Sequence, residues 1–232
     1  YLLTEKKLPT YIKLNPTLLG FLKVRSILNK LGWTRIELKR ETFEHDLQFE
    51  DAVRLVENLR NTAERQDLYF GIKLSNTLAN VNSVSRLPGT ERYMSGRALF
   101  PITVRLASEL VDTVPGINAL SFCGGVSYFN ARACIEAGLG PLTVATDILK
   151  PGGYQRMLSI AEETVRGLKE EHALKPDPER LHLLADGVFN KPYYLESFKK
   201  GTTNIKKPLP MTDCFAARSE EHTSELQSRQ VI

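Results

Sequence analysis

The amino-acid sequence predicts an α/β fold, namely the C-terminal part of a TIM (β/α)8 barrel with about five β/α units, followed by an irregular linker. Apolar runs of strand length alternate five times with stretches of helical periodicity, which is typical of a parallel sheet with helical crossovers. No Gly-x-Gly-x-x-Gly turn follows a strand, and this disfavours the alternative, an open doubly wound sheet. Because a closed barrel has eight units, we expect about three of them to be missing upstream.

The five predicted strands are short apolar runs, and each is followed by a segment with apolar residues at helical spacing. The predicted strands cover residues 11–14, 36–38, 69–74, 118–122 and 142–146. The predicted helices cover residues 21–31, 49–63, 101–110, 127–138 and 154–172. Ser127 and Asp46 have the side chains that favour N-caps, and we expect each to cap the helix that follows it.

The segment from residue 75 to residue 100 breaks the alternation, since it is rich in Ser, Asn, Gly and Pro. A loop of this length inside a compact domain is uncommon and is often functional. We therefore expect residues 75–100 to form a loop that contributes to a site.

Composition and charge narrow the function classes. The chain is 42% hydrophobic and 25% charged, and its net charge is only +4, so we interpret the basic pairs in the last third as solvated surface and expect no nucleic-acid binding. No apolar run has the length of a bilayer span, and no signal sequence is visible at the start. Three widely spaced cysteines favour a reducing compartment, so a cytoplasmic location is expected. Because the chain opens with Tyr1, we expect its true beginning to be absent.

The sequence predicts four parts along the chain. The barrel covers residues 1–175, and residues 176–208, punctuated by prolines, form a linker that wraps it. Residues 209–217 form a third part, which contains Cys214. The run from Arg218 to Ser228 reads as the in-frame translation of a sequencing-library adapter, so we exclude residues 218–232 from fold and function.

The strongest candidate site joins the ends of two neighbouring strands. Gly124 and Gly125 separate a predicted strand from a helix, and Thr146 ends the next strand. Glycine lets the backbone approach a ligand, and the start of a helix favours an anion. Phosphate groups commonly bind after the last two strands of such barrels, so we predict a phosphate site here. The alternative is that each glycine pair only permits a tight turn.

A second candidate site lies at the end of the strand that precedes the long loop. Lys73 and Asn76 would be delivered to the barrel mouth, where they can hydrogen-bond a polar heterocycle or its phosphate. Ser95 and Gly96, just before a predicted helix, could meet the same anion. The alternative interpretation is a solvated lysine and an asparagine that turns the chain.

Other polar residues give weaker signals. His45, His172 and His182 have no neighbours at metal-ligand spacing. Cys123 and Cys134 are expected to be small buried residues. No Ser/His/Asp arrangement stands out in the sequence.

With these residues identified, the chain resembles the dihydroorotate dehydrogenase-like barrel of multidomain iron–sulfur flavoproteins such as dihydropyrimidine dehydrogenase. Within that group it looks most like the bacterial selenate reductase large subunits. The resemblance covers residues 11–217 and is carried by Tyr11–Gly20, Phe70–Thr77, Tyr93–Pro101 and Lys150–Tyr154. It implies an FMN whose phosphate lies at Gly124, Gly125 and Thr146. It also implies a flavin ring approached by Lys73 and Asn76, with Ser95 and Gly96 nearby.

The resemblance also implies what residues 209–217 are. A similar Asp-Cys-Phe opens the [4Fe–4S] helical domain of those proteins, so Cys214 would be the first cluster cysteine. An FAD- and NAD(P)H-binding module would follow, and the partners of this barrel would be those other redox domains. A cluster needs four thiolates, so this chain is expected to bind none.

The chain departs from the family at two places. The family's Asn-Leu-Ser-Cys-Pro at a strand end is matched here to residues 38–43, which lack the amide and the small side chains. The loop that carries a proton-transferring Cys or Ser in the family has Ser83 and Ser85 but no cysteine.

Three functions therefore remain open. The first is a fragment of an electron-transferring oxidoreductase, an enzyme in its full-length parent, with a barrel that binds FMN. The second is a flavin-free barrel that acts as a docking platform for the neighbouring Fe–S and FAD/NAD(P)H domains. The third is a barrel enzyme that acts on a small phosphorylated metabolite.

Overall fold

The computed structural model describes residues 1–83, 88–150, 152–168 and 174–189. At its centre is a parallel sheet with the strand order β1 (Thr10–Leu14), β2 (Phe70–Leu74) and β5 (Leu120–Phe122). A single parallel bridge between Phe122 and Leu142 extends this sheet by one position. The predicted α/β class with parallel strands is therefore confirmed.

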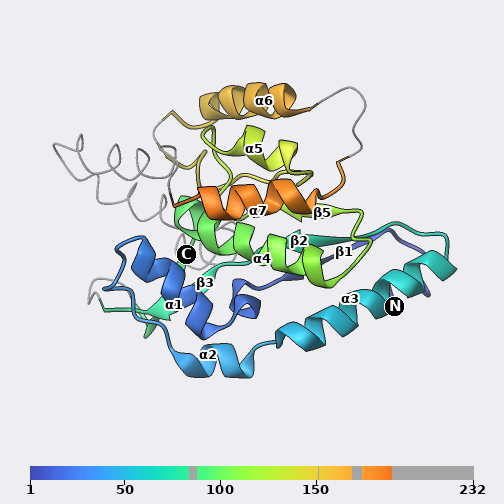
Figure 1. Ribbon diagram of the computed structural model, residues 1–232, viewed down its shortest axis with the longest axis horizontal. Coiled ribbons are helices and arrows are strands. Elements are labelled where there is room, and N and C mark those ends of the chain that lie inside the picture. Colours follow the sequence, from blue (N-terminus) through green and yellow to red (C-terminus); the bar gives the residue numbers. More distant parts are fainter. Residues whose placement is uncertain (84–87, 151, 169–173, 190–232) are drawn as a thin grey trace.

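Helices and a small hairpin surround this sheet (Figure 1). The helical elements are η1 (Pro16–Leu19), α1 (Phe21–Lys30), α2 (Arg40–His45), α3 (Phe49–Arg65), η2 (Gly96–Leu99), α4 (Phe100–Thr113), α5 (Ala131–Glu136), α6 (Gln155–Gly167) and α7 (Pro178–Gly187). The hairpin consists of β3 (Leu78–Val81) and β4 (Glu91–Met94).

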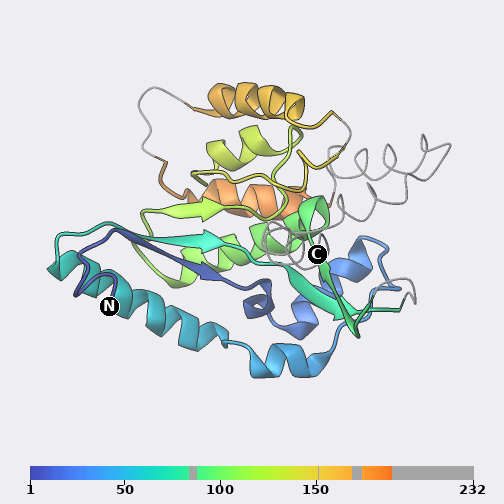
Figure 2. The same cartoon turned by 180° about the vertical axis from the view of Figure 1, so that it is seen from behind.

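The two faces of the sheet have different chemistry. Ile72 and Leu74 of β2 pair with Leu120 and Phe122 of β5, and all four side chains are buried. The Phe122 ring meets the Phe100 ring of α4 edge-on at 5.9 Å, so this face packs on the helices. Burial of each such side chain contributes about 1.5–3 kcal/mol. Figure 2 looks onto the opposite face, with the strands in front of α4.

The opposite face carries polar side chains at matched positions. Lys13, Lys73 and Ser121 are paired across β1, β2 and β5. Because side chains alternate along a strand, these three point away from the face that packs on α4. In a closed barrel, this would be the face that lines the interior.

The predicted strand at residues 36–38 is wrong. That segment has no strand geometry, and β1 pairs directly with β2 over its whole length. The Glu37 carbonyl instead accepts a hydrogen bond at 2.9 Å from the Val81 amide at the end of β3. A run of only two apolar residues around a glutamate gives too little apolar surface to compete with β1 for the edge of β2. Of the predicted strand at 142–146, only the bridge at Leu142 is formed.

The segment of residues 75–100 contains regular structure that its composition concealed. Leu78 of β3 lies opposite Met94 of β4, and both side chains are buried. The pair anchors the hairpin to the core, and η2 then leads directly into α4. Pro101 stands in the first turn of α4, as predicted.

Two predicted helix caps are wrong. Helix α5 begins at Ala131 with Asn130 as its N-cap residue, and the Asn130 Oδ1 accepts a hydrogen bond from the Ser127 amide at 2.8 Å. Helix α3 begins after Gln48, while the Asp46 carboxylate is engaged elsewhere. Asn130 and Gln48 therefore occupy the two N-cap positions, and neither side chain makes a capping hydrogen bond to its helix.

The part of the chain predicted as linker begins with a helix. The Asp177 carboxylate caps α7 by accepting a hydrogen bond from the Arg180 amide at 3.1 Å, and α7 packs against α4. The remaining predicted linker, Cys214 and the adapter-like tail lie outside the described residues, as does His172. None of the described helices is long and apolar enough to span a bilayer.

Candidate functional site

The predicted phosphate-site residues come together at the carboxyl end of the sheet. A Cβ atom placed on Gly125 would lie 2.3 Å from the Gly96 carbonyl oxygen, and one placed on Gly96 would lie 2.7 Å from the Thr146 Cγ2. The loop after β5, the start of η2 and the turn after Leu142 are therefore in direct contact. Gly96 and Gly125 also have positive φ angles, +65° and +84°, which glycine adopts without strain.

Gly124 faces the interior of the fold. A Cβ atom on Gly124 would lie 2.4 Å from the Thr103 Cβ in α4. The Thr103 hydroxyl is buried, lies 3.0 Å from the Ser75 hydroxyl and donates to the Leu99 carbonyl at 3.1 Å. Gly124 is thus required by the close packing of α4 against the loop after β5.

A buried carboxylate, which the sequence did not single out, lies beside this convergence. The Asp147 Oδ1 accepts hydrogen bonds from the Arg97 Nη2 at 2.9 Å and the Lys150 Nζ at 3.2 Å, and its Oδ2 accepts one from the Arg156 Nε at 3.2 Å. The Asp147 side chain is only 2% exposed. Three cations from three segments therefore surround one carboxylate. We call these four residues the Asp147 cluster.

Burial and charge oppose each other at the Asp147 cluster. Burial of the carboxyl acts to raise the pKa of Asp147, but the neighbouring cations, Arg97 first, outweigh burial and hold this pKa below its usual value. Burial lowers the pKa values of Arg97 and Lys150. Arg97 and Lys150 are therefore held near the carboxylate at some desolvation cost.

Arg97 is fixed by more than this ion pair. Its guanidinium lies 4.7 Å from the centre of the Phe129 ring, in a cation–π arrangement. Its Nε is buried, as is the Ser127 hydroxyl, and neither atom has a hydrogen-bond partner within the described part of the chain. These two buried polar atoms therefore have hydrogen-bonding capacity left for a ligand.

Lys73 and Asn76 belong to a different arrangement. Lys73 lies on the polar face of β2, while the Asn76 side chain turns to the end of β1, where its Nδ2 donates to the Asn15 Oδ1. The Asn15 Nδ2 in turn donates to the Asp46 Oδ2 at 2.8 Å, and the Thr17 hydroxyl donates to the same oxygen at 2.5 Å. This network connects the ends of β1 and β2.

The polar residues beside the end of β2 come from the segment that follows β1. Because β1 is the neighbour of β2, Asn15 and Thr17 lie at this edge of the sheet. An amide is therefore present at this strand end. The signal in the sequence was the polar Asn-Pro-Thr directly after an apolar run.

The structure also forms a Ser/His/Asp contact that the sequence did not indicate. The His182 ring lies 3.3 Å from the Ser108 Oγ and 3.0 Å from the Asp112 Oδ1. Ser108 lies in the packed interface of α4 with α7 and is 1% exposed, so no substrate reaches its hydroxyl. We interpret this contact as a bridge between two helices.

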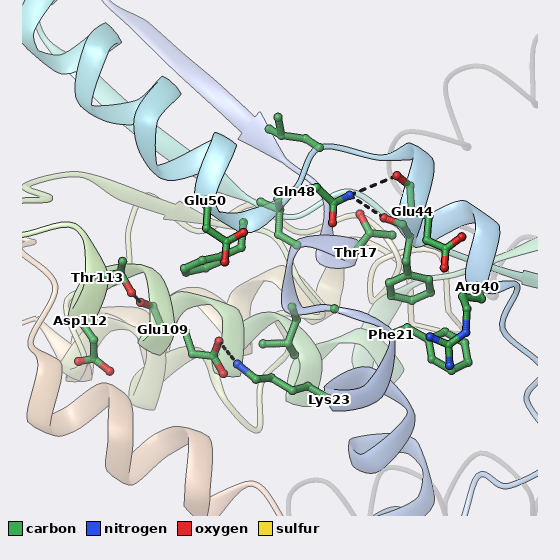
Figure 3. Close-up of a pocket in the computed structure, with 16 residues that line it drawn as sticks. Thr17, Phe21, Lys23, Arg40, Glu44, Gln48, Glu50, Glu109, Asp112 and Thr113 are labelled. Carbon is green, nitrogen blue, oxygen red and sulfur yellow. Dashed lines mark hydrogen bonds and ion pairs between the residues drawn. The ribbon is translucent and has the colours of Figure 1, made fainter.

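A cleft of about 540 Å³ lies away from the Asp147 cluster. It is bordered by η1, α1, α2, the start of α3 and α4 (Figure 3). Charged side chains of both signs line it, and Lys23 is paired there with Glu109 at 2.7 Å. None of the predicted site residues lines this cleft.

The remaining predictions concern thiols and metals. Cys123 and Cys134 are buried as expected, and burial raises the pKa of the Cys134 thiol. Across the described ranges, no group of three His, Cys, Asp or Glu side chains is arranged to hold a metal ion. Cys214 as a cluster ligand stays a prediction.

Parallel strands with helical crossovers, and polar residues gathered at the carboxyl ends of those strands, define a protein of the α/β class. The profile of the family "Oxidoreductase YgfK, N-terminal TIM-barrel domain" matches residues 1–196. The chain belongs to this family.

Two curated relatives agree with this membership. The protein named "Putative oxidoreductase YgfK" is 41% identical over 218 residues in Escherichia coli strain K12 and equally so in Escherichia coli O157:H7. Each match covers 94% of this chain but 21% of the relative. The chain thus spans about a fifth of the length of the curated relatives it matches.

Proposed function

We propose that this chain is the barrel domain of a multidomain electron-transferring oxidoreductase, and that the barrel is a flavin-free platform for neighbouring redox domains. The family's name supports the oxidoreductase part, and the greater length of the relatives supports the presence of further domains. Those domains would be the [4Fe–4S] and FAD/NAD(P)H modules that the resemblance implies. The platform part depends on the Asp147 cluster.

The single observation that carries the platform proposal is the buried Asp147 carboxylate, an anion that belongs to the chain itself. Asp147 places a buried carboxylate, held by three cations, beside Gly96, Gly125 and Thr146, where a flavin phosphate was predicted. A phosphate brought to the same position would meet a buried negative charge a few ångströms away, and like charges repel strongly in a poorly solvated site. The carboxylate therefore substitutes for the ligand.

The glycines favour the same conclusion. The space beside the Cα atoms of Gly96, Gly124 and Gly125 is filled by Thr146, by Thr103 and by the Gly96–Arg97 backbone, respectively. In this arrangement glycine is needed so that the chain can pack against itself. A ligand is not required to explain any of the three.

An FMN-binding barrel is the second candidate, and specific observations favour it. Three cations surround only one carboxylate, so the cluster has excess positive charge. The Arg97 Nε and the Ser127 hydroxyl have hydrogen-bonding capacity left within the described residues, and Lys73 lies on the polar face of the sheet. Phosphate and ring anchoring by these groups would be the chemistry of that alternative.

Cofactor analysis of the full-length parent separates the two candidates. The purified protein is denatured, and the released FMN, FAD and iron are quantified. We expect FAD and iron without FMN. One FMN per polypeptide would overturn the platform proposal.

A point mutation tests directly whether the Asp147 carboxylate takes the place of a bound anion. Asp147→Ala removes the anion but leaves Arg97, Lys150 and Arg156, so the variant should gain a binding site for inorganic phosphate. We expect millimolar phosphate to raise the melting temperature of Asp147→Ala at constant ionic strength, because a ligand that binds only the folded state stabilises it. The matched control is Asp186→Ala, which removes an exposed carboxylate paired with Arg105 and should gain no such response. A wild-type protein that phosphate already stabilises would contradict the proposal.

A further inference from the structure

A second, smaller pocket of about 160 Å³ lies between α3 and the amino ends of β2 and β5. Figure 2 shows α3 running toward the end of the sheet at which β1 and β2 begin. The pocket therefore lies at the opposite end of the sheet from the Asp147 cluster. We call it the α3 pocket, and its lining consists of Val56, Arg60, Ala63 and Glu64 of α3, residues 68–72 and residues 116–119.

Most of the lining of the α3 pocket is apolar and is held by the core. Val56, Ala63 and Ile72 are each 1% exposed, so these walls are fixed by the packing of α3 on the sheet. Protein interiors contain few voids larger than a water molecule. An apolar space of roughly 150 Å³ holds a molecule of the size of benzene. The apolar part of the α3 pocket is therefore suited to one ring-sized group.

Arg60 is the cation of this lining. Its side chain is only 28% exposed, and its Nη1 donates to the Pro115 carbonyl at 2.5 Å, which holds the guanidinium beside the loop before β5. The nearest carboxylate, that of Glu64, lies 4.0 Å from the Arg60 Nε and is 67% exposed, so this ion pair contributes little. The other N–H groups of Arg60 have no stronger partner within the described residues. Arg60 therefore has donors left for a planar, two-oxygen anion.

We propose that the α3 pocket binds a small aromatic carboxylate, with its ring against the apolar walls and its carboxylate on Arg60. The apolar walls disfavour a wholly polar anion such as phosphate, because such an anion loses its hydration there without compensation. The guanidinium disfavours an aromatic amine, because like charges repel. Only a ligand with both an apolar body and one negative end satisfies the two parts together. The proposal goes beyond the platform function and does not depend on it.

Binding of benzoate to the full-length parent tests the charge of the ligand. Ligand-observed NMR titration at constant ionic strength should give a Kd of about 1 mM, as is usual for so small a ligand. Arg60→Gln should raise this Kd at least about tenfold, because hydrogen bonds to a charged group are lost. The matched control is Arg54→Gln on the same helix, since Arg54 is 72% exposed and does not line the pocket. Absence of benzoate binding, or an equal Kd in Arg60→Gln and the wild type, would overturn the proposal.

A second variant tests the apolar walls while Arg60 stays in place. Ala63→Leu adds a larger side chain to the lining, and leucine is a good helix former, so α3 should persist. We expect a rise of at least about tenfold in the Kd for benzoate, because the added side chain takes the space of the ring. An unchanged Kd would mean that the ring binds elsewhere.

Photolabelling locates the ligand without any substitution in the chain. Azidobenzoate is irradiated with the wild-type parent, and the labelled peptides are identified by mass spectrometry. We expect labels within residues 56–72 or 116–119, and we expect excess benzoate to suppress them while benzylamine does not. Labels confined to other segments would refute the proposal. The FMN, FAD and iron content of the parent is measured separately, so the failure of one proposal is distinguishable from the failure of the other.

Discussion

Helices α4 and α6 have similar lengths, 14 and 13 residues, but they are packed very differently. Helix α4 buries nine of its residues, and α6 buries two. α4 has contacts with α7, η1, η2 and α1, whereas α6 packs mainly on α5. A helix with apolar residues therefore need not bury them, because burial depends on which elements pack against it.

The Asp147 cluster connects these two regions. Arg97 lies just before α4, Arg156 lies in the first turn of α6, and Asp147 in the intervening chain binds both. The cluster thus anchors the start of the poorly packed helix to the well-packed one. Core packing and the Asp147 cluster should therefore make separate contributions to the free energy of unfolding.

The largest expected difference is between the two helices themselves. In the 232-residue chain, Phe100→Ala in α4 should lower the free energy of unfolding by about 3–5 kcal/mol, because it leaves a cavity beside Phe122. Leu158→Ala in α6 should change it by less than about 0.5 kcal/mol, because this side chain is exposed. Urea unfolding followed through Trp33, the single tryptophan of the chain, measures both. Equal losses would refute the comparison.

The anchor should be nearly as important as the core. Asp147→Ala leaves three partly buried cations without their carboxylate, and we expect a loss of about 3 kcal/mol in the free energy of unfolding. Asp186→Ala breaks an exposed pair with Arg105 and should cost at most about 1 kcal/mol. The same urea titration applies. If the two variants lost equal stability, the Asp147 cluster would be no anchor.

Gly125 tests the close approach of the loops at the mouth of the sheet. Gly125→Ala introduces a Cβ atom 2.3 Å from a backbone oxygen at φ +84°, so strain and overpacking together should cost about 2–3 kcal/mol. Gly89→Ala is the matched control, since Gly89 has φ +86° with nothing within 4 Å of the added atom. Its cost should be about 1 kcal/mol from backbone strain alone. Thermal melting of both variants measures the difference, and a Gly89 cost as large as the Gly125 cost would show that the loops are not in tight contact.

The smallest effect is a dependence of stability on pH. Because the folded pKa of Asp147 lies below its unfolded value, the stabilisation is fully present above the unfolded pKa of about 3.9 and is lost as pH falls through the folded pKa. Urea midpoints measured from pH 6 down to pH 3 should therefore decline less steeply in Asp147→Asn than in the wild type. Identical slopes would mean that this carboxylate does not contribute to the acid dependence.

Some residues of the candidate site could be predicted from the sequence, and others could not. Gly125 and Thr146 were expected to approach each other, because strand ends of a parallel sheet share one edge, and the structure brings both into contact with Gly96. Whether they bind a cofactor stays a prediction. Asp147 was overlooked because no pattern near it suggests a buried charge: it follows a threonine at the end of a short predicted strand and lies three residues before a lysine. Its three cations come from positions 97, 150 and 156.

The sequence alone determined the α/β class and three helices, predicted at 21–31, 49–63 and 101–110 and found as α1, α3 and α4, because local hydrophobic periodicity is sufficient for such elements. Only the tertiary structure decided that β1 is the neighbour of β2, that residues 36–38 form no strand and that a hairpin lies within residues 75–100. Strand pairing depends on contacts between residues far apart in the chain, and a short apolar run carries no information about its partner. For the same reason, the buried carboxylate and the poor packing of α6 appear only when the distant segments are placed together.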